Sequence, residues 1–220
     1  MSIAENLHRI RASIPSGVTL IVVSKTQNIS AILEAYEQGQ RIFGENKVQE
    51  ILVKQPLLPK DIQWHAIGHL QTNKVKFIIP FISLIHAVDS LKLLQEINRQ
   101  AFKHQRKVDC LLQIHIATEE TKFGLSYAEA EELLHSESIK ELKNINIIGL
   151  MGMASNTEVT EQIKAEFEML FTFFKKAQFI HSHFTTLSMG MSSDYEIAIQ
   201  QGSTMVRVGS AIFGERIALP

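Results

Sequence analysis

The run Val18-Thr19-Leu20-Ile21-Val22-Val23-Ser24-Lys25 is the first of eight similar segments that decide the fold. Its apolar residues are continuous and do not alternate with polar ones, which is typical of a parallel strand buried on both faces. The segment that follows, residues 29–38, has helical spacing and ends at Gly39, a residue type that commonly stops helices. A buried strand followed by a helix is the first half of a parallel crossover.

The same alternation continues to the end of the chain. Short runs rich in β-branched residues are followed by longer runs with apolar residues at three- and four-residue spacing. We interpret eight runs as strands: residues 18–24, 41–44, 63–67, 84–88, 108–116, 145–150, 185–188 and 205–208. The helices that we expect are residues 29–38, 91–105, 127–135, 160–179 and 195–201, with an extra helix at 3–14. Ser126 with Glu129, and Ser193 with Glu196, have the spacing of capping boxes that begin helices.

Eight strand–helix repeats are the number that closes a parallel barrel. We therefore expect an α/β fold, a single (β/α)8 TIM barrel, in one domain that covers residues 1–220. Residues 1–17 would form an N-terminal helical extension that packs on the barrel. The alternative is an open, doubly wound sheet, but no Gly-x-Gly-x-x-Gly motif follows the first strand, which weakens its dinucleotide-binding form.

Charge, cysteine content and hydropathy exclude several classes of protein. The 22 Lys and Arg residues against 23 Asp and Glu residues give no overall basic field for nucleic acid or an anionic membrane. Cys110 is the only cysteine, so we expect no intrachain disulfide and a buried, inert thiol. His181 and His183 have no evident third metal ligand, and we expect no metal site. The chain has neither an 18-residue apolar run nor the apolar centre of a signal peptide, so we expect a cytoplasmic protein.

Lys25 ends the first strand, and in a barrel of this kind reactive groups lie at the carboxyl ends of strands. Partial burial lowers the pKa of a lysine, and the neutral amine is the nucleophile that condenses with an aldehyde. The alternative is a lysine whose stem packs on the barrel while its ammonium group reaches solvent. Lys25 alone leaves both interpretations open.

The segment after the last strand has the composition of an anion site. Gly209 lets the backbone approach a ligand, Ser210 adds a hydroxyl, and the short helical turn that follows presents free N–H groups. Barrels often bind phosphate after strands seven and eight, and Ser192 in the strand-seven loop is available for a ligand if Ser193 caps the next helix. Arg207 alternates in phase with Met205 and Gly209, which predicts that it points into the barrel and needs a carboxylate or a ligand as its partner. Together these features indicate a phosphorylated aldehyde.

The ordered series of motifs in this chain resembles the YggS/PROSC family of pyridoxal-phosphate homeostasis proteins, which is related in fold to the barrel domain of alanine racemase. The motifs that carry the resemblance are Val23-Ser24-Lys25-Thr26, Phe43-Gly44-Glu45-Asn46, the run from Trp64 to Lys74, Thr121-Lys122-Phe123-Gly124, Gly149-Leu150-Met151, the run from Leu187 to Ser192 and the strand-eight segment. They extend from residue 22 to residue 216 in the family's order. Two departures are small: Gln27-Asn28 stands where many relatives have Lys-Pro, and Ser210 replaces a frequent threonine while keeping the hydroxyl.

The resemblance implies the cofactor pyridoxal 5′-phosphate (PLP) and a role for each matching residue. It implies that Lys25 holds PLP as a Schiff base and that Asn46 lines the cofactor face. It implies that Ser192, Gly209 and Ser210 contact the phosphate, and that Arg207 is the partner of the pyridine nitrogen. We assign no catalytic residue and no metal ligand.

Three functions compete for such a site. The first is a PLP carrier in PLP homeostasis, which passes the cofactor to apo-enzymes. Arginine stays cationic and cannot act as a counter-ion to a protonated ring nitrogen, so the ring would be a poor electron sink, although alanine racemase shares this arrangement. Only six residues follow Gly214, so we expect no second racemase domain, no second acid/base group and a monomer. The alternatives are a PLP-dependent amino-acid racemase or lyase, and a Schiff-base aldolase.

Overall fold

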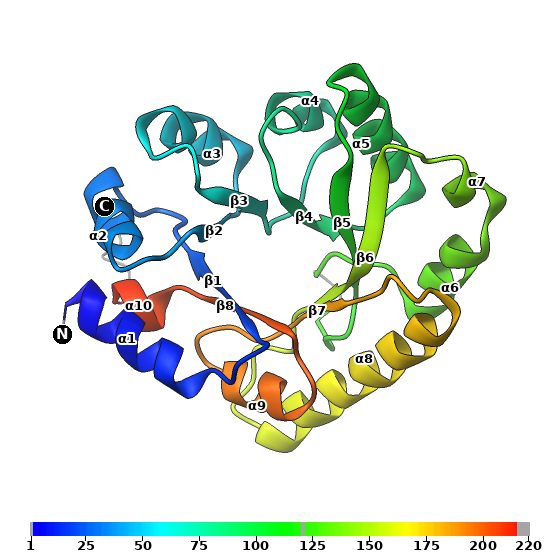
Figure 1. The fold of residues 1–220 in the computed structure, drawn as a ribbon. Coiled ribbons are helices and arrows are strands. Elements are labelled where there is room, and N and C mark those ends of the chain that lie inside the picture. Colours follow the sequence, from blue (N-terminus) through cyan, green and yellow to red (C-terminus); the bar gives the residue numbers. More distant parts are fainter. Residues whose placement is uncertain (1, 120–121, 215–220) are drawn as a thin grey trace.

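Eight parallel strands close into a barrel in the order of the sequence (Figure 1). In this computed structural model, which describes residues 2–119 and 122–214, each strand pairs with the next and β8 pairs with β1. The strands are β1 Thr19–Val23, β2 Ile42–Glu45, β3 Gln63–Ala66, β4 Leu84–Val88, β5 Val108–Ile114, β6 Ile145–Gly152, β7 Thr186–Ser188 and β8 Met205–Val208. The expected (β/α)8 barrel is therefore confirmed.

Helices surround the barrel and connect its strands (Figure 1). The α-helices are α1 Ile3–Ser13, α2 Ile29–Glu37, α3 Val48–Lys54, α4 Val75–Ile78, α5 Leu91–Lys103, α6 Tyr127–His135, α7 Glu137–Lys140, α8 Thr160–Ile180, α9 Tyr195–Gln200 and α10 Ser210–Phe213. Two 3-10 turns, η1 Gln55–Leu57 and η2 Thr72–Lys74, lie before β3 and before α4. No helix in the described part of the chain is long and apolar enough to span a membrane.

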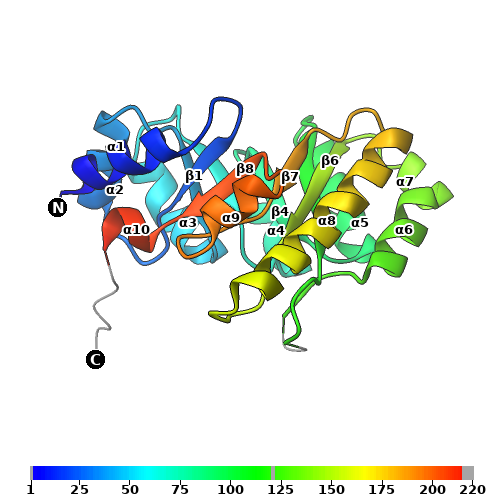
Figure 2. The same cartoon turned by 90° about the horizontal axis from the view of Figure 1, so that it is seen from below.

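The expected N-terminal helix is present as α1. It begins with a capping box in which Ser2 accepts from the N–H of Glu5 and Glu5 accepts from the N–H of Ser2. Its apolar face buries Leu7 and Ile10, and α1 contacts α2 and α10. Figure 2 shows α1 lying beside α10 at one side of the barrel. This packing joins the start of the chain to the segment that follows β8.

Most of the core lies between the strands and the outer helices. The long helix α8, for example, buries Phe167, Leu170 and Phe174 on the barrel. Cys110 is buried on β5, and burial raises the pKa of its thiol far above the ordinary value, as expected for an inert cysteine. A smaller apolar cluster inside the barrel comprises Ile21, Leu84, Ala87, Leu111, Met151 and Met205.

One expected capping box is wrong, although its helix, α9, begins at Tyr195 as predicted. Ser126 and Glu129 do form the capping box that begins α6. At α9, however, the residue before the first helical position is Asp194, and no side chain caps the helix. The Asp194 carboxylate accepts a hydrogen bond from the backbone N–H of Met191 at 2.5 Å. The loop between β7 and α9 is therefore held by the hydrogen bond to Asp194, and Ser193 lines a pocket instead of capping the helix.

Candidate functional site

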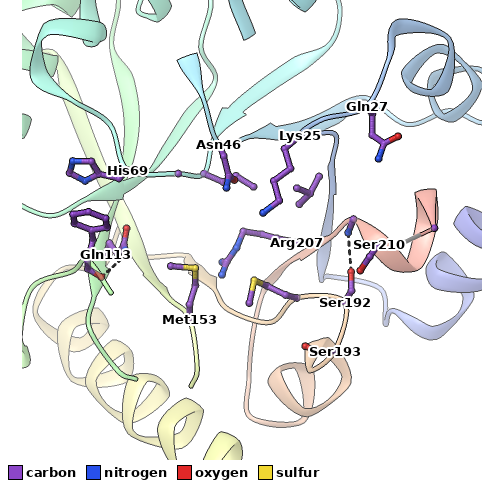
Figure 3. A pocket seen from close by; sticks show the side chains of 17 residues that line it. Lys25, Gln27, Asn46, His69, Gln113, Met153, Ser192, Ser193, Arg207 and Ser210 are labelled. Atoms are coloured by element: carbon purple, nitrogen blue, oxygen red, sulfur yellow. Dashed lines mark hydrogen bonds between the residues drawn. The ribbon is translucent and has the colours of Figure 1, made fainter. Parts of the chain in front are cut away.

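A pocket of about 410 Å³ opens at the carboxyl ends of the strands (Figure 3). All six residues that the sequence selected line it: Lys25, Asn46, Ser192, Arg207, Gly209 and Ser210. They come from the ends of β1, β2, β7 and β8, far apart in the sequence. Gln113, Phe123 and Met153 also line the pocket and were not predicted as site residues. Phe123 belongs to one of the family motifs, whereas nothing local separates Gln113 and Met153 from other residues near strand ends.

The half-buried Lys25 lies two residues after the end of β1, and the residues on either side of it are held by hydrogen bonds. The hydroxyl of Ser24 donates to the Glu45 carboxylate at 2.7 Å. The backbone N–H of Thr26 donates to the Glu50 carboxylate at 2.7 Å. Thr26 has a φ of 66°, a left-handed conformation that is uncommon for a β-branched residue. The turn that carries Lys25 is thus fixed on both sides, and it aims the lysine side chain into the pocket (Figure 3).

Asn46 reaches the pocket because its backbone passes very close to that of Gly68. A Cβ atom on Gly68 would lie 2.6 Å from the backbone oxygen of Asn46 and 2.9 Å from its Cα. Only glycine tolerates such an approach of two backbones. Gly68 therefore lets the segment after β2 lie against the segment after β3, with both residues lining the pocket.

The segments after β7 and β8 meet at the opposite side of the pocket from His69 (Figure 3). The hydroxyl of Ser192 accepts from the backbone N–H of Gly209 at 3.1 Å and from that of Ala211 at 3.4 Å. Ser210 lines the pocket beside them at the start of α10. Backbone N–H groups and hydroxyls gathered in this way form a concave site that suits a phosphate group.

Arg207 points into the barrel as its strand phase predicted, and its side chain is 3% exposed. It donates from one terminal nitrogen to the backbone oxygen of Ser188 at 2.8 Å and to the Ser188 hydroxyl at 2.6 Å. The other terminal nitrogen donates to the backbone oxygen of Gly152 at 2.9 Å. Burial lowers the pKa of Arg207 to about 10, so the guanidinium stays charged at neutral pH. Within the described residues its hydrogen-bond acceptors are neutral oxygens; of the two expected partners, a carboxylate or a ligand, the carboxylate is not among them.

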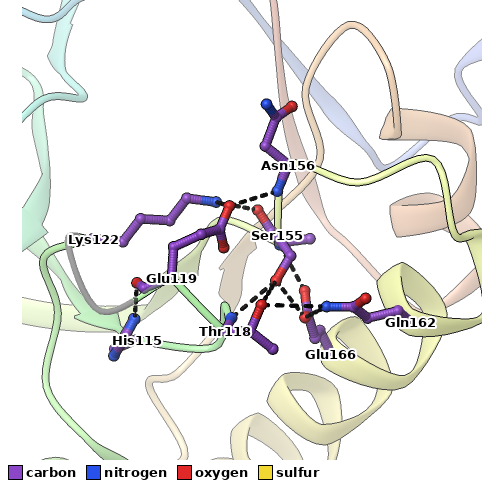
Figure 4. Close-up of polar contacts among 9 residues, drawn as sticks. His115, Thr118, Glu119, Lys122, Ser155, Asn156, Gln162 and Glu166 are labelled. Carbon is purple, nitrogen blue, oxygen red and sulfur yellow. Dashed lines mark hydrogen bonds and ion pairs between the residues drawn. The ribbon is translucent and has the colours of Figure 1, made fainter.

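The loops after β5 and β6 are joined beside the pocket by a polar network (Figure 4). The Ser155 hydroxyl donates to the buried Glu166 carboxylate at 2.6 Å and accepts from the backbone N–H of Thr118 at 2.9 Å. Lys122 donates to the backbone oxygen of Ala154 at 2.7 Å. Thr121, the first residue of one motif used above, lies outside the described residues.

The histidines of the sequence have separate places. His69 stacks on Phe123 with ring centroids 4.1 Å apart, and both rings line the pocket. His181 and His183 follow the end of α8, and the ring of His181 lies near those of His135 and His183. Among the residues that the structure describes, no group of three or more metal-ligating side chains could hold a metal ion.

Sequence and structure comparisons place the chain in a family. The family model described as "Alanine racemase, N-terminal domain" matches residues 1–217. The chain belongs to the alanine racemase N-terminal domain family. Within this family, the pyridoxal phosphate homeostasis protein of Escherichia coli K12 is 38% identical over 229 residues, which cover 97% of each chain. That of Aquifex aeolicus VF5 is 40% identical over 199 residues, covering 90% of this chain and 86% of the relative. The expected resemblance is confirmed.

Solved structures of the family agree with the barrel. PipY of Synechococcus elongatus PCC7942 without PLP superimposes with a TM-score of 0.91 at 37% identity, covering 97% of this chain and all of PipY (100%). The structure of PipY with PLP bound superimposes with a TM-score of 0.87. Alanine racemase of Clostridium difficile 630 has a TM-score of 0.80 at 15% identity and shares the fold alone; 57% of that chain is covered.

Proposed function

We propose that this chain binds pyridoxal 5′-phosphate as a Schiff base on Lys25 and serves PLP homeostasis without turnover of its own. The observation that carries the proposal is that a lysine amine, a phosphate-shaped site and a buried guanidinium line one pocket of about 410 Å³. The relatives named above support it, since they are called pyridoxal phosphate homeostasis proteins and PipY has been solved with PLP bound.

The residues of the pocket fit PLP group by group. Lys25 would supply the amine for the aldehyde, and Ser192, Gly209 and Ser210 would hold the phosphate. The Arg207 guanidinium has five N–H groups, of which three donate within the described chain. One terminal N–H and the Nε–H are therefore available for the ring nitrogen of the ligand. Asn46 would contact the face of the ring.

The bound cofactor would supply an electrophilic imine carbon, and the residues of the chain would limit the reactions that follow from it. Arg207 is a cation that cannot stabilise a protonated ring nitrogen, so the ring withdraws electrons weakly. We assign no residue to proton transfer at an amino-acid Cα. The proposal accordingly describes a binding protein and not an enzyme, with one domain over residues 1–220, a monomeric state and a cytoplasmic location.

Release of the cofactor would follow from exchange of amines. We propose that another amine, such as an amino acid or the lysine of an apo-enzyme, displaces Lys25 from the imine carbon. The C=N bond to the incoming amine would replace the C=N bond to Lys25, and the two protons that the incoming nitrogen loses would pass to the Lys25 nitrogen, which leaves as a free amine. Transfer to an apo-enzyme that is faster than release into buffer supports direct handover, whereas equal rates exclude it.

Borohydride reduction followed by peptide mass mapping tests the cofactor and its attachment together. The protein with added PLP should show the visible absorption of an imine, and reduction should fix the phosphopyridoxyl group on the peptide that contains Lys25. Lys25→Ala should lose both signals, whereas Lys47→Ala, a change next to Asn46 at a residue that does not line this pocket, should keep them. A protein that stays colourless with added PLP would remove the proposal.

The alternative of an amino-acid racemase or lyase has a separate test. Proton exchange at Cα of several amino acids should not exceed that of free PLP if the protein is a carrier. Exchange that is well above that of free PLP and is abolished by Lys25→Ala would favour the racemase or lyase over the carrier.

A further inference from the structure

A chain of four buried side chains crosses the interior of the barrel behind the pocket. The Arg207 guanidinium donates to the Ser188 hydroxyl at 2.6 Å. Nδ1 of His86 lies 3.1 Å from the same hydroxyl, and Nε2 of His86 lies 3.1 Å from Nδ1 of His65. The four residues come from β8, β7, β4 and β3, and none is more than 4% exposed. Neither histidine was assigned this place by the sequence.

The positions of the protons along these four side chains follow from the positive charge of Arg207 at one end. The Ser188 oxygen already accepts from a cation, which favours the arrangement in which the Ser188 hydroxyl donates its own proton to Nδ1 of His86. Because Nδ1 of His86 is then an acceptor, the proton of this ring is on Nε2, and it is donated to Nδ1 of His65. All donors thus run in one direction, away from the guanidinium, and each bond polarises the next.

Both histidines are neutral in this arrangement. Burial lowers the pKa of His65 to about 3. Burial, together with the neighbouring His65 and Arg207, holds the pKa of His86 well below its ordinary value. A carboxylate in the place of His86 would put a negative charge next to Ser188 and partly neutralise the guanidinium. The neutral relay instead fixes the direction of the guanidinium and leaves its charge uncompensated by contact.

Asp194 is the acidic residue that acts on Arg207 electrostatically, and it does not substitute for the relay. It attracts the guanidinium, but its Oδ1 accepts from the backbone N–H of Met191. Among the described residues no hydrogen bond or ion pair joins Asp194 to Arg207. The orientation of the guanidinium therefore depends on Ser188, on Gly152 and on the histidine behind Ser188.

We propose that His86 is a positioning residue which, through Ser188, aims the free N–H groups of Arg207 at the ring nitrogen of the ligand. The pocket would thereby select phosphorylated aldehydes whose ring carries an acceptor nitrogen over analogues that have carbon at that position. This inference rests on the proposed binding of PLP, because it assigns a determinant of ring selectivity to that same pocket.

The test compares PLP with its 1-deaza analogue, in which a C–H group replaces the ring nitrogen. The measured quantity is the ratio of the two dissociation constants, from absorption titrations. The wild-type protein should favour PLP by about tenfold, the value of one hydrogen bond to a charged group. His86→Leu and Ser188→Ala should each lower this ratio to threefold or less, because the guanidinium loses its support.

Two further variants separate positioning from a structural effect. His86→Asn keeps an acceptor near the place of Nδ1 and should retain most of the selectivity. Ser203→Ala removes another buried hydroxyl, one that contacts backbone oxygens of Leu187, Met189 and Met205 and not Arg207, so it should leave the ratio unchanged. Thermal unfolding without ligand identifies the variants that are folded. If His86→Leu is not folded, Ser188→Ala alone provides the test.

The outcomes distinguish this inference from the proposal on which it rests. A wild-type protein that binds neither ligand would overturn the proposed function. A wild-type protein that binds both with equal affinity would keep PLP binding and overturn the selectivity of Arg207. An unchanged tenfold ratio in folded His86→Leu and Ser188→Ala would overturn the positioning role of His86.

Discussion

The ammonium group of Lys54 lies 2.7 Å from the carboxylate of Glu45, and both side chains are buried below the turn that carries Lys25. The same ammonium donates to the backbone oxygen of Ser24 at 2.8 Å and contacts Glu50 at 2.9 Å. Lys54 therefore links the supports on both sides of Lys25. Burial raises the pKa of Glu45, and its Oε2 is buried without a hydrogen-bond partner within the described chain, so this carboxylate depends on Lys54 for its charge compensation.

Removing that ammonium should be costly. Lys54→Met leaves the Glu45 carboxylate buried without its ion pair, and we expect a loss of about 3–5 kcal/mol in the free energy of unfolding. Urea denaturation at pH 7 measures it. Lys140→Met is the control, because Lys140 pairs with Glu137 at the surface, and it should leave the free energy of unfolding unchanged. Equal stabilities of the two variants would show that the buried pair contributes nothing.

The buried histidines should make stability depend on pH. The unfolded chain binds a proton on His65 below its ordinary pKa of 6.5, whereas the folded chain does so only near 3 because of burial. The contribution of His65 is thus fully present above pH 6.5 and is lost as the pH falls from 6.5 toward 3. The expected slope is about 1.4 kcal/mol per pH unit for this group.

Urea denaturation at pH 5 and pH 6 checks this slope. His65→Gln should lower it by about 1.4 kcal/mol per pH unit relative to the wild-type protein. His8→Gln, a change on the exposed side of α1, is the matched control and should keep the wild-type slope. If His65→Gln also keeps it, His65 does not titrate as its burial requires.

The barrel and the direction of Arg207 could be predicted because they depend on periodicity. Continuous apolar runs fix parallel strands, and the two-residue repeat of β8 fixes which side chains point inward. Leu84–Val88 and Met205–Val208 were predicted without error at either end. Lys25 could be selected because a lysine that ends an apolar strand stands out from its neighbours.

The supports of the site could not be predicted, because they depend on contacts between distant segments. Lys54 belongs to α3, a seven-residue helix with no side-chain cap and therefore no start signal in the sequence. His86 lies in the middle of β4, where nothing local shows that it faces Ser188 102 residues away. Arg207 was expected to need a carboxylate or a ligand; its acceptors in the described residues include the Ser188 hydroxyl, and the contact of that hydroxyl with His86 could not be read from the sequence.

The proposed phosphate site should respond to a change at Ser192 in a way that depends on the ligand. Ser192→Ala removes the hydroxyl that lies on the N–H groups of Gly209 and Ala211, and it should weaken PLP binding by about tenfold, the value of one charge-assisted hydrogen bond. Pyridoxal, which has no phosphate, should bind the variant and the wild-type protein equally. Absorption titrations measure both ligands. Parallel losses for PLP and pyridoxal would place Ser192 elsewhere in the ligand's surroundings.

The close approach of Gly68 to Asn46 gives the last prediction. In Gly68→Ala the new methyl group would lie 2.6 Å from a backbone oxygen, and backbone cannot move aside as a side chain can. We expect a loss of about 1–3 kcal/mol in stability and weaker PLP binding, because Asn46 is displaced from the pocket wall.

Gly44→Ala is the comparison, since its methyl group would meet only side-chain carbons of Ile21 and Ile67, at 2.9 Å or more. Those side chains can adjust their rotamers, so this variant should lose less stability and bind PLP more tightly than Gly68→Ala. A folded Gly68→Ala with wild-type affinity would mean that Asn46 can leave its place without consequence for the ligand, and the assignment of Asn46 to the cofactor face would then be wrong.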